Sequence, residues 1–225
     1  METNLHRSLK ERHGPTAGGR CEVSVDGFRI DAVAADGTLV EIQSGGLGAL
    51  RPKLRSLLPR HRIRVVKPIA LSRVVVRRAS ADGPDLSRRR SPRRGSLIEA
   101  FEDLVGLAPL LPDPNLSVEI LGVAIEEVRV PRRRRPGFSV VDRRLLDVRE
   151  AVIIDSVDDL WALLPVDFPR FEPFSTADLA RDLGTARPFA QRVAYCLRCA
   201  GAAQSVAKRG NSYIYTARTG IVAVK

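Results

Sequence analysis

Two Asp-Gly pairs, each set between short alternating segments, constrain the fold of this chain most strongly. The first, Asp26-Gly27, joins residues 21–25 to residues 28–33. The second, Asp36-Gly37, joins that segment to residues 38–43. An Asp-Gly pair between alternating residues is the strongest short-range signal for a β-hairpin. The sequence therefore predicts three consecutive strands.

Helical segments flank these strands. Residues 3–13 carry leucines at i and i+4 and predict a short helix, and residues 47–58 carry leucines at helical spacing. Residues 63–66 predict a fourth strand, and residues 70–76 a fifth. A helix between the third and fourth strands is a crossover, so we expect those strands to be parallel. The order αβββαβ then predicts an α/β core with helices on the faces of its sheet.

The middle of the chain is less regular. Residues 80–95 predict a polar, basic loop, and residues 96–104 predict a helix. Residues 116–130 predict a strand with a bend near Gly122, and residues 147–154 another strand.

The pattern changes from about residue 155 onward. Residues 157–164 predict a helix, and Ser175-Thr176-Ala177-Asp178 has the sequence of a capping box that opens a second one. A third helix runs to Ala200, with Thr185 as its expected N-cap, and Lys208-Arg209-Gly210-Asn211 predicts a β-hairpin turn. Helix, helix, turn, helix and hairpin is the layout of a winged-helix domain.

Basic charge is concentrated in the first two thirds of the chain. The net charge is +11, and residues 155–225 contribute only +2 of it, from nine Lys or Arg and seven Asp or Glu. Almost all the basic residues are arginines, clustered as Arg88-Arg89-Arg90, Arg93-Arg94 and Arg132–Arg135. Guanidinium groups match phosphate oxygens, so a nucleic-acid partner follows. The alternative is a solvated surface in an arginine-rich proteome.

Composition sets the cellular setting. Hydrophobic residues make up 44% of the chain and charged residues 28%, as in ordinary folded domains. No apolar run approaches the ~20 residues of a membrane span, so no membrane partner is expected. The polar N-terminus does not resemble a secretory signal, and three cysteines do not make a disulfide framework. We expect a bacterial-type cytoplasmic protein.

Acidic residues stand on two neighbouring predicted strands. Asp31 lies between Ile30 and Ala32, and alternation places its side chain opposite to theirs. Glu41 and Gln43 likewise face away from their apolar neighbours, so the three polar side chains are expected on one surface. Two adjacent carboxylates repel each other unless a cation joins them, and Mg²⁺ or Mn²⁺ suits oxygen ligands and phosphate.

With these residues the chain resembles the restriction-endonuclease-like nucleases, whose signature is Asp followed by Glu-x-Lys on the next strand. The resemblance covers roughly residues 1–78 and implies metal ligation by Asp31, Glu41 and the backbone of Ile42. The family lysine, which positions the attacking water, is replaced here by Gln43. Some family members move this lysine to the following helix, where Lys53 lies.

The branch that resembles junction-resolving and Mrr-type nucleases also has an acidic residue on its first helix, and Glu11 or Glu2 could fill that role. An exposed hairpin can equally carry an Asp and a Glu as solubilising residues. Lacking the lysine, the site could also be catalytically dead.

The last predicted helix has a polar face that suits DNA. Its members are Arg187, Gln191, Tyr195 and Arg198, and Lys208 and Arg209 lie at the hairpin tip. A recognition helix presents such side chains to bases and phosphates. A winged helix used for protein contacts is the alternative.

Other metal and histidine signals are weak. Cys196 and Cys199 have the spacing of half a zinc site, but both fall inside a predicted helix, so core packing is favoured. His6 is close to the predicted acidic face, where we favour a surface side chain.

The sequence as a whole predicts an α/β nuclease-like core in residues 1–80, an extension with basic loops in residues 81–154, and a winged-helix domain in residues 155–225. The predicted function is metal-dependent cleavage of nucleic acid, with DNA favoured over RNA and a homodimer left open. The alternatives are a non-catalytic DNA-binding regulator with a degenerate nuclease fold and an RNA-associated factor.

Overall fold

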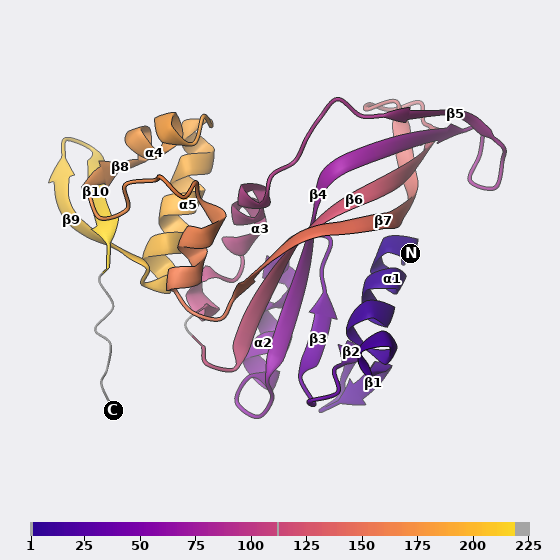
Figure 1. Ribbon diagram of the computed structural model, residues 1–225, viewed down its shortest axis with the longest axis horizontal. Helices are drawn as coiled ribbons and strands as arrows, with labels where there is room; N and C mark the ends of the chain where they lie inside the picture. The colour runs from indigo at the N-terminus through magenta and orange to yellow at the C-terminus, as the bar shows by residue number, and fades with distance from the viewer. Residues whose placement is uncertain (1, 112, 219–225) are drawn as a thin grey trace.

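One large mixed sheet organises the molecule (Figure 1). The computed structural model describes residues 2–111 and 113–218, and its architecture is mixed α/β with 29% helix and 40% strand. The strand order is β1-β2-β3-β4-β6-β7, and β5 pairs with β4. The strands are β1 (Arg20–Val25), β2 (Phe28–Val33), β3 (Leu39–Ile42), β4 (Ile63–Arg78), β5 (Asp85–Arg90), β6 (Leu116–Pro131) and β7 (Phe138–Ile154).

The first half of the chain follows the predicted element order. Helix α1 (Asn4–His13) precedes three antiparallel strands, and α2 (Arg51–Leu57) connects β3 to β4. Strands β3 and β4 are parallel, which confirms the predicted crossover. Strand β6 also runs parallel to β4, so the segment after residue 80 supplies a strand next to the centre of the sheet.

Helices cover both faces of this sheet (Figure 1). On one face, Leu5 and Leu9 of α1 pack in a cluster that includes Val40 and Ile42 of β3. On the other face, the leucines of α2 belong to a larger cluster that includes Leu39. Neighbouring residues of β3 therefore point into different cores, as the pleat of a strand requires.

Three strands differ from the prediction. Residues 63–66 and 70–76 form one continuous strand, β4, whose register against β6 shifts between Ala70 and Ser72. Part of the predicted basic loop is strand β5, which pairs with the half of β4 that extends beyond β3. Strand β7 begins at Phe138, well before the predicted residue 147. In each case backbone pairing with β4 or β6 overrides a weak local pattern.

The remaining elements are short helical segments along the chain and the C-terminal elements from η5 onward. They are η1 (Pro15–Ala17), η2 (Leu47–Leu50), η3 (Leu97–Ala100), α3 (Phe101–Leu104), η4 (Ala108–Leu110), η5 (Asp158–Leu163), β8 (Phe174–Ser175), α4 (Thr176–Asp182), α5 (Arg187–Ala200), β9 (Ala203–Arg209) and β10 (Ser212–Ala217). Strands β8, β10 and β9 make a second, small antiparallel sheet.

The predicted capping box is present. The Ser175 side chain accepts hydrogen bonds from the N–H groups of Ala177 and Asp178, and the Asp178 carboxylate accepts from the Ser175 N–H. The predicted Thr185 cap is wrong, because α5 begins after Ala186 without a side-chain cap. The predicted helix at residues 157–164 is a 3₁₀ segment, η5.

The C-terminal elements pack on the same hydrophobic core as the large sheet. One continuous cluster includes Leu104 of α3, Leu107 after it, and Val193 and Leu197 of α5. Beyond this core, the far halves of β4, β6 and β7 project with β5 as an arm (Figure 1). No helix in residues 2–111 or 113–218 is long and apolar enough to span a bilayer.

Candidate acidic site and nucleic-acid interface

Asp31 and Glu41 lie where β2 parts from β3. The ladder between these strands holds only Ala32 opposite Val40 and Val33 opposite Leu39. Beyond it, β2 continues to pair with β1 and β3 continues to pair with β4. The two acidic residues therefore come at the first position where their strands stop sharing backbone hydrogen bonds.

Side chains replace the missing backbone pairing at this point. The Ile42 N–H donates to Asp31 Oδ2 at 2.9 Å, and the Asp31 N–H donates to Glu41 Oε1 at 3.4 Å. The predicted proximity of Asp31 and Glu41 is confirmed. The prediction that side chains along β2 alternate regularly between the two faces of the sheet is wrong at this point. Ile30 and Ala32 belong to the cores on opposite faces of the sheet, because β2 bends away from β3 between them.

Glu41 is paired with a lysine from α2. Its carboxylate is almost fully buried, at 8% side-chain exposure, and Lys53 Nζ lies 2.5 Å from Oε1. Lys53 also donates to the Arg29 carbonyl oxygen. Burial raises the pKa of Glu41 above its ordinary value, although the Lys53 ammonium acts in the opposite direction.

Asp31 is held by a histidine from α1 on the other side. His6 Nε2 lies 3.2 Å from Asp31 Oδ1, so His6 is a contact residue of the site rather than the surface side chain we favoured. Burial works against ionisation of Asp31, but the hydrogen bonds from His6 and the Ile42 N–H outweigh it and hold the pKa of Asp31 below its ordinary value. The two neighbouring carboxyls thus have pKa values shifted in opposite directions.

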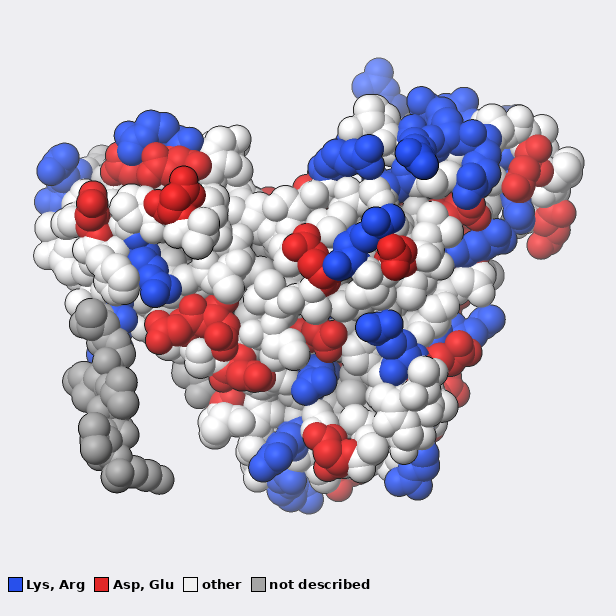
Figure 2. Space-filling model, in the orientation of Figure 1, with Lys and Arg blue, Asp and Glu red and all other residues white. Residues whose placement is uncertain are grey.

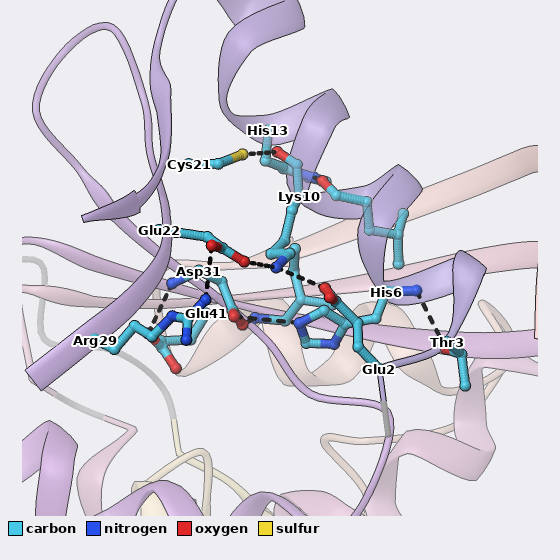
Figure 3. A network of polar contacts seen from close by, with 12 residues as sticks. Glu2, Thr3, His6, Lys10, His13, Cys21, Glu22, Arg29, Asp31 and Glu41 are labelled. Carbon is cyan, nitrogen blue, oxygen red and sulfur yellow. Dashed lines mark hydrogen bonds and ion pairs between the residues drawn. The ribbon is translucent and has the colours of Figure 1, made fainter. Parts of the chain in front are cut away.

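A cavity of about 430 Å³ opens beside Asp31, between α1 and the strand ends (Figure 3). It is lined by Glu2, Thr3, His6, Lys10, Glu22, Arg29, Asp31, Gln43, Ser44 and Gly45. Of the two acidic residues considered for the first helix, Glu2 lines this cavity. Glu11 is exposed and does not line it.

Lys10 holds the acidic rim of this cavity together. Its Nζ lies 2.6 Å from Glu2 Oε1 and 2.7 Å from Glu22 Oε1, and Arg29 pairs with the second oxygen of Glu22 at 2.6 Å (Figure 3). The lysine was not singled out from the sequence. Its signal is its position one turn after His6 on the face of α1 that meets the strands.

Gln43 and Lys53 approach the acids from different directions. Gln43 lines the cavity beside Asp31 and donates its side-chain N–H to the Gly46 carbonyl at 3.2 Å. Lys53 reaches Glu41 from the opposite face of the sheet. The positive charge beside Glu41 therefore comes from Lys53. The neutral Gln43 amide contributes no charge to the site.

Lys67 fixes the loop that follows Gln43. This buried lysine of β4 donates to the Ser44 and Gly45 carbonyls at 3.1 and 2.8 Å and pairs with Asp103 of α3 at 2.6 Å. Its signal in the sequence is a lone lysine inside an apolar strand. Its donors are all occupied by protein, so its role is to position the loop.

Asp31 and Glu41 supply two of the oxygen ligands that a hard divalent cation such as Mg²⁺ requires. Among the described residues, no group of three or more His, Cys, Asp or Glu is arranged to hold a metal ion. Mg²⁺, however, keeps several waters and is commonly bound by only one or two protein carboxylates. Asp31 and Glu41 make such a pair, and the backbone of Ile42 lies against Asp31. Within the described chain, Glu41 Oε2 accepts no hydrogen bond, but Glu41 does not line the cavity beside Asp31.

The predicted arginine clusters lie on the arm and in the loop that leads from β5 to η3. Arg88 of β5 pairs with Glu126 at 3.1 Å, while Arg89 and Arg90 are exposed and form no ion pair with the described residues. Arg93 lies 3.9 Å from a Glu99 oxygen, and Arg94 is exposed. The cluster Arg132–Arg135 is exposed at the turn between β6 and β7. Figure 2 shows the resulting concentration of basic side chains over the arm.

A groove of about 900 Å³ lies between the sheet, α3 and the C-terminal elements. Basic residues on its walls include Lys67, Arg73, Arg93 and Arg143, and acidic residues of α3 and α4 also line it. Ser44 lines both this groove and the smaller cavity beside Asp31. The loop after β3 therefore contributes to the walls of both hollows.

The polar face predicted for the last helix lines a third hollow. Arg187, Gln191, Tyr195 and Arg198 of α5 face a cavity of about 510 Å³ that the β9–β10 hairpin closes on its other side. Lys208 and Arg209 are exposed at the end of β9, next to the hairpin turn. Cys196 is buried in the core and Cys199 half-buried.

The fold and this site define a mixed α/β protein with a pair of acidic residues at a break in its large sheet. A sequence family described as "Domain of unknown function (DUF8091)" matches residues 3–155, and the chain belongs to this family. A relative described as "Uncharacterized protein", from Treponema pallidum (strain Nichols), is 36% identical over 219 residues, which are 95% of this chain and 84% of the relative. No solved structure matches the chain.

Proposed function

We propose that the protein is a metal-dependent nuclease that hydrolyses phosphodiester bonds at the Asp31–Glu41 pair. The observation that carries this proposal is the contact between Lys53 Nζ and Glu41 Oε1, 2.5 Å apart, beside Asp31. In this proposal, Lys53 of α2 takes the place of the lysine that the restriction-endonuclease-like signature has two residues after the glutamate. The observed order of α1, three antiparallel strands, α2 and a parallel strand supports the same assignment.

The residues of the site would divide the chemistry as follows. Asp31, whose ionised form is favoured, and Glu41 would hold the cation, with the Ile42 carbonyl as a further oxygen ligand. A bound Mg²⁺ or Mn²⁺ stabilises charge on the scissile phosphate and acidifies a water ligand. Lys53 would fix the orientation of Glu41, and the Gln43 amide would orient a water in the cavity beside Asp31.

The basic surfaces support nucleic acid as the substrate. Arg89 and Arg90 on the arm, and Arg132–Arg135 at the turn between β6 and β7, are exposed and form no ion pair with the described residues. Phosphate contacts of this kind give affinity without sequence preference. Helices α4 and α5 and the β9–β10 hairpin support the predicted winged helix, which would add affinity, with DNA favoured over RNA.

The test is cleavage of labelled DNA and RNA with Mg²⁺ or Mn²⁺, repeated with chelator. We expect Asp31→Asn, Glu41→Gln and Lys53→Met each to lower the cleavage rate about 10²–10³-fold, as the loss of one preorganised charged group does. Asp26→Asn is the matched control, because Asp26 lies on the same hairpin but pairs with Arg60 and His61 instead. Cleavage that survives the three site substitutions, or that persists in chelator, contradicts the assignment.

A non-catalytic nucleic-acid-binding protein is the second function that an observation favours. Both oxygens of Asp31 accept hydrogen bonds, and Glu41 is already neutralised by Lys53. Such a network can hold the sheet together without a metal. Binding of nucleic acid with no cleavage under either cation would establish this function instead.

A further inference from the structure

The cavity between α5 and the β9–β10 hairpin has the shape of a receptor for a small group. Side chains predicted to read the major groove of DNA line its wall, and Arg187 donates to Ser212 Oγ across it at 3.3 Å. A recognition helix must instead protrude, because the whole helix enters the groove. At about 510 Å³ the cavity falls in the range of small-molecule sites.

The charge of this cavity selects an anion. Arg187 and Arg198 both line it, and no Asp or Glu does. Neither arginine forms an ion pair with any residue of the described chain, whereas Arg192 on another face of the same helix pairs with Glu102 at 3.0 Å. Unpaired guanidinium groups that converge on a hollow bind phosphate oxygens well.

The aromatic residues of the cavity select a planar group. Tyr195, Tyr213 and Tyr215 all line it, and Tyr213 is 53% exposed. The Arg198 guanidinium carbon lies 5.9 Å from the centre of the Tyr195 ring, so charge and aromatic surface adjoin. Exposed tyrosines beside basic residues are the usual platform for unpaired bases.

We propose that this cavity binds one nucleotide unit of a single-stranded nucleic acid, with its phosphate at Arg187 and Arg198 and its base against Tyr213. The inference rests on the proposed binding of nucleic acid but not on cleavage. The C-terminal elements would then recognise strand ends, overhangs or unpaired bases rather than the edges of a closed duplex.

The experiment measures binding of the full chain by fluorescence anisotropy in chelator, where cleavage does not interfere. Its probes are a short labelled single strand, the blunt duplex of the same sequence, and AMP as a competitor. We expect the single strand to bind about tenfold more tightly than the duplex, and Tyr213→Ala to remove about tenfold of that affinity through lost stacking. Tyr213→Phe keeps the ring and should bind like the wild type.

Arg198→Gln tests the phosphate contact, and Arg192→Gln is its control with the same change of charge on the same helix. We expect the first to weaken single-strand binding about tenfold and the second less than twofold. Displacement by AMP that is lost in Arg198→Gln would show that a free nucleotide also enters the cavity, and it supports the inference. Thermal unfolding of each variant verifies that it is folded.

Several results would overturn the inference. Equal affinity for strand and blunt duplex would do so, as would equal effects of Arg198→Gln and Arg192→Gln or wild-type binding by Tyr213→Ala. These results leave nucleic-acid binding itself intact. Failure to bind any probe would instead reject the proposed function together with the inference.

Discussion

In the proposed nuclease site, Lys53 of α2 takes the role that the family signature gives to the residue two positions after the glutamate. The residue two positions after Glu41 is Gln43, which lines the cavity without bringing a charge. Lys53 comes from a different element and reaches Glu41 from the opposite face of the sheet. Because Glu41 is buried, its lysine partner also has a structural effect that can be measured without any substrate.

Lys53→Met should therefore destabilise the protein as well as the site. It leaves a buried carboxylate without its cation, and we expect a loss of about 1–3 kcal/mol in the free energy of unfolding at neutral pH. The double variant Glu41→Gln/Lys53→Met should recover most of that loss, since it leaves no unpaired charge. Urea denaturation in chelator measures both. Equal stability of the single variant and the wild type would show that the pair contributes nothing to the fold.

Among the elements, α1 depends on a buried polar contact as well as on its leucines. His13 at its end places Nε2 3.1 Å from Glu119 of β6, while Nδ1 contacts the Leu9 carbonyl at 2.9 Å. Burial opposes ionisation of Glu119, but the hydrogen bond from His13 and the nearby charges of Arg64 and Arg12 hold its pKa below the ordinary value of 4.5. The ionised form therefore stabilises the docked helix.

Glu119→Gln should show a stability difference that depends on pH. A depressed pKa contributes stability above the unfolded-state value and loses it as pH falls through the folded-state value. We expect the variant to be about 1–2 kcal/mol less stable at pH 7 and the difference to shrink below pH 4.5. Urea denaturation across this range tests it, with the exposed Asp147→Asn as control. A difference that stays constant with pH would contradict the assignment.

Local signals predicted the elements whose partners are near in sequence. The two Asp-Gly turns gave β1, β2 and β3, and the capping residues gave α4. Strand β5 was missed because its arginines show no apolar alternation, and its pairing depends on β4 extending beyond β3. In the site, Asp31 and Glu41 were predicted from adjacent strands. The contact of His6 with Asp31 needs the packing of α1, which no local pattern specifies.

Across the whole molecule, the arginines fall into two groups, those paired with buried glutamates and those that are exposed and unpaired within the described residues. Buried Glu126 and Glu127 on β6 each form ion pairs with two or more arginines, and these pairs hold the strands of the arm together. The exposed Arg89 and Arg90 take no part in these pairs. Uncompensated side chains of this kind, which also include Arg94 and Arg132–Arg135, displace counterions from a polyanion, so Arg89 and Arg90 should contribute to the salt dependence of binding.

The double variant Arg89→Gln/Arg90→Gln should make binding of duplex DNA less sensitive to salt. Each lost phosphate contact lowers the slope of log K against log salt by ~0.9, so the slope should become shallower by about 1.8. Arg181→Gln/Arg192→Gln is the control, because both arginines are already paired with carboxylates on the C-terminal helices and α3. Titrations at several salt concentrations measure the slopes. An unchanged slope would place the phosphate contacts elsewhere.

The bond from the Ile42 N–H to the Asp31 carboxylate has a consequence for how relatives are compared. The Asp31 carboxylate replaces a missing backbone hydrogen bond between β2 and β3. It therefore joins the two strands whether or not the site has catalytic activity. A relative that has lost catalysis would still keep an aspartate there, since its loss leaves a backbone N–H unsatisfied. Glu41 and Lys53 neutralise each other and can be discarded together. Under the proposed function, joint retention or loss of that pair, rather than of the aspartate, is the trait expected to distinguish relatives that cleave nucleic acid from relatives that do not.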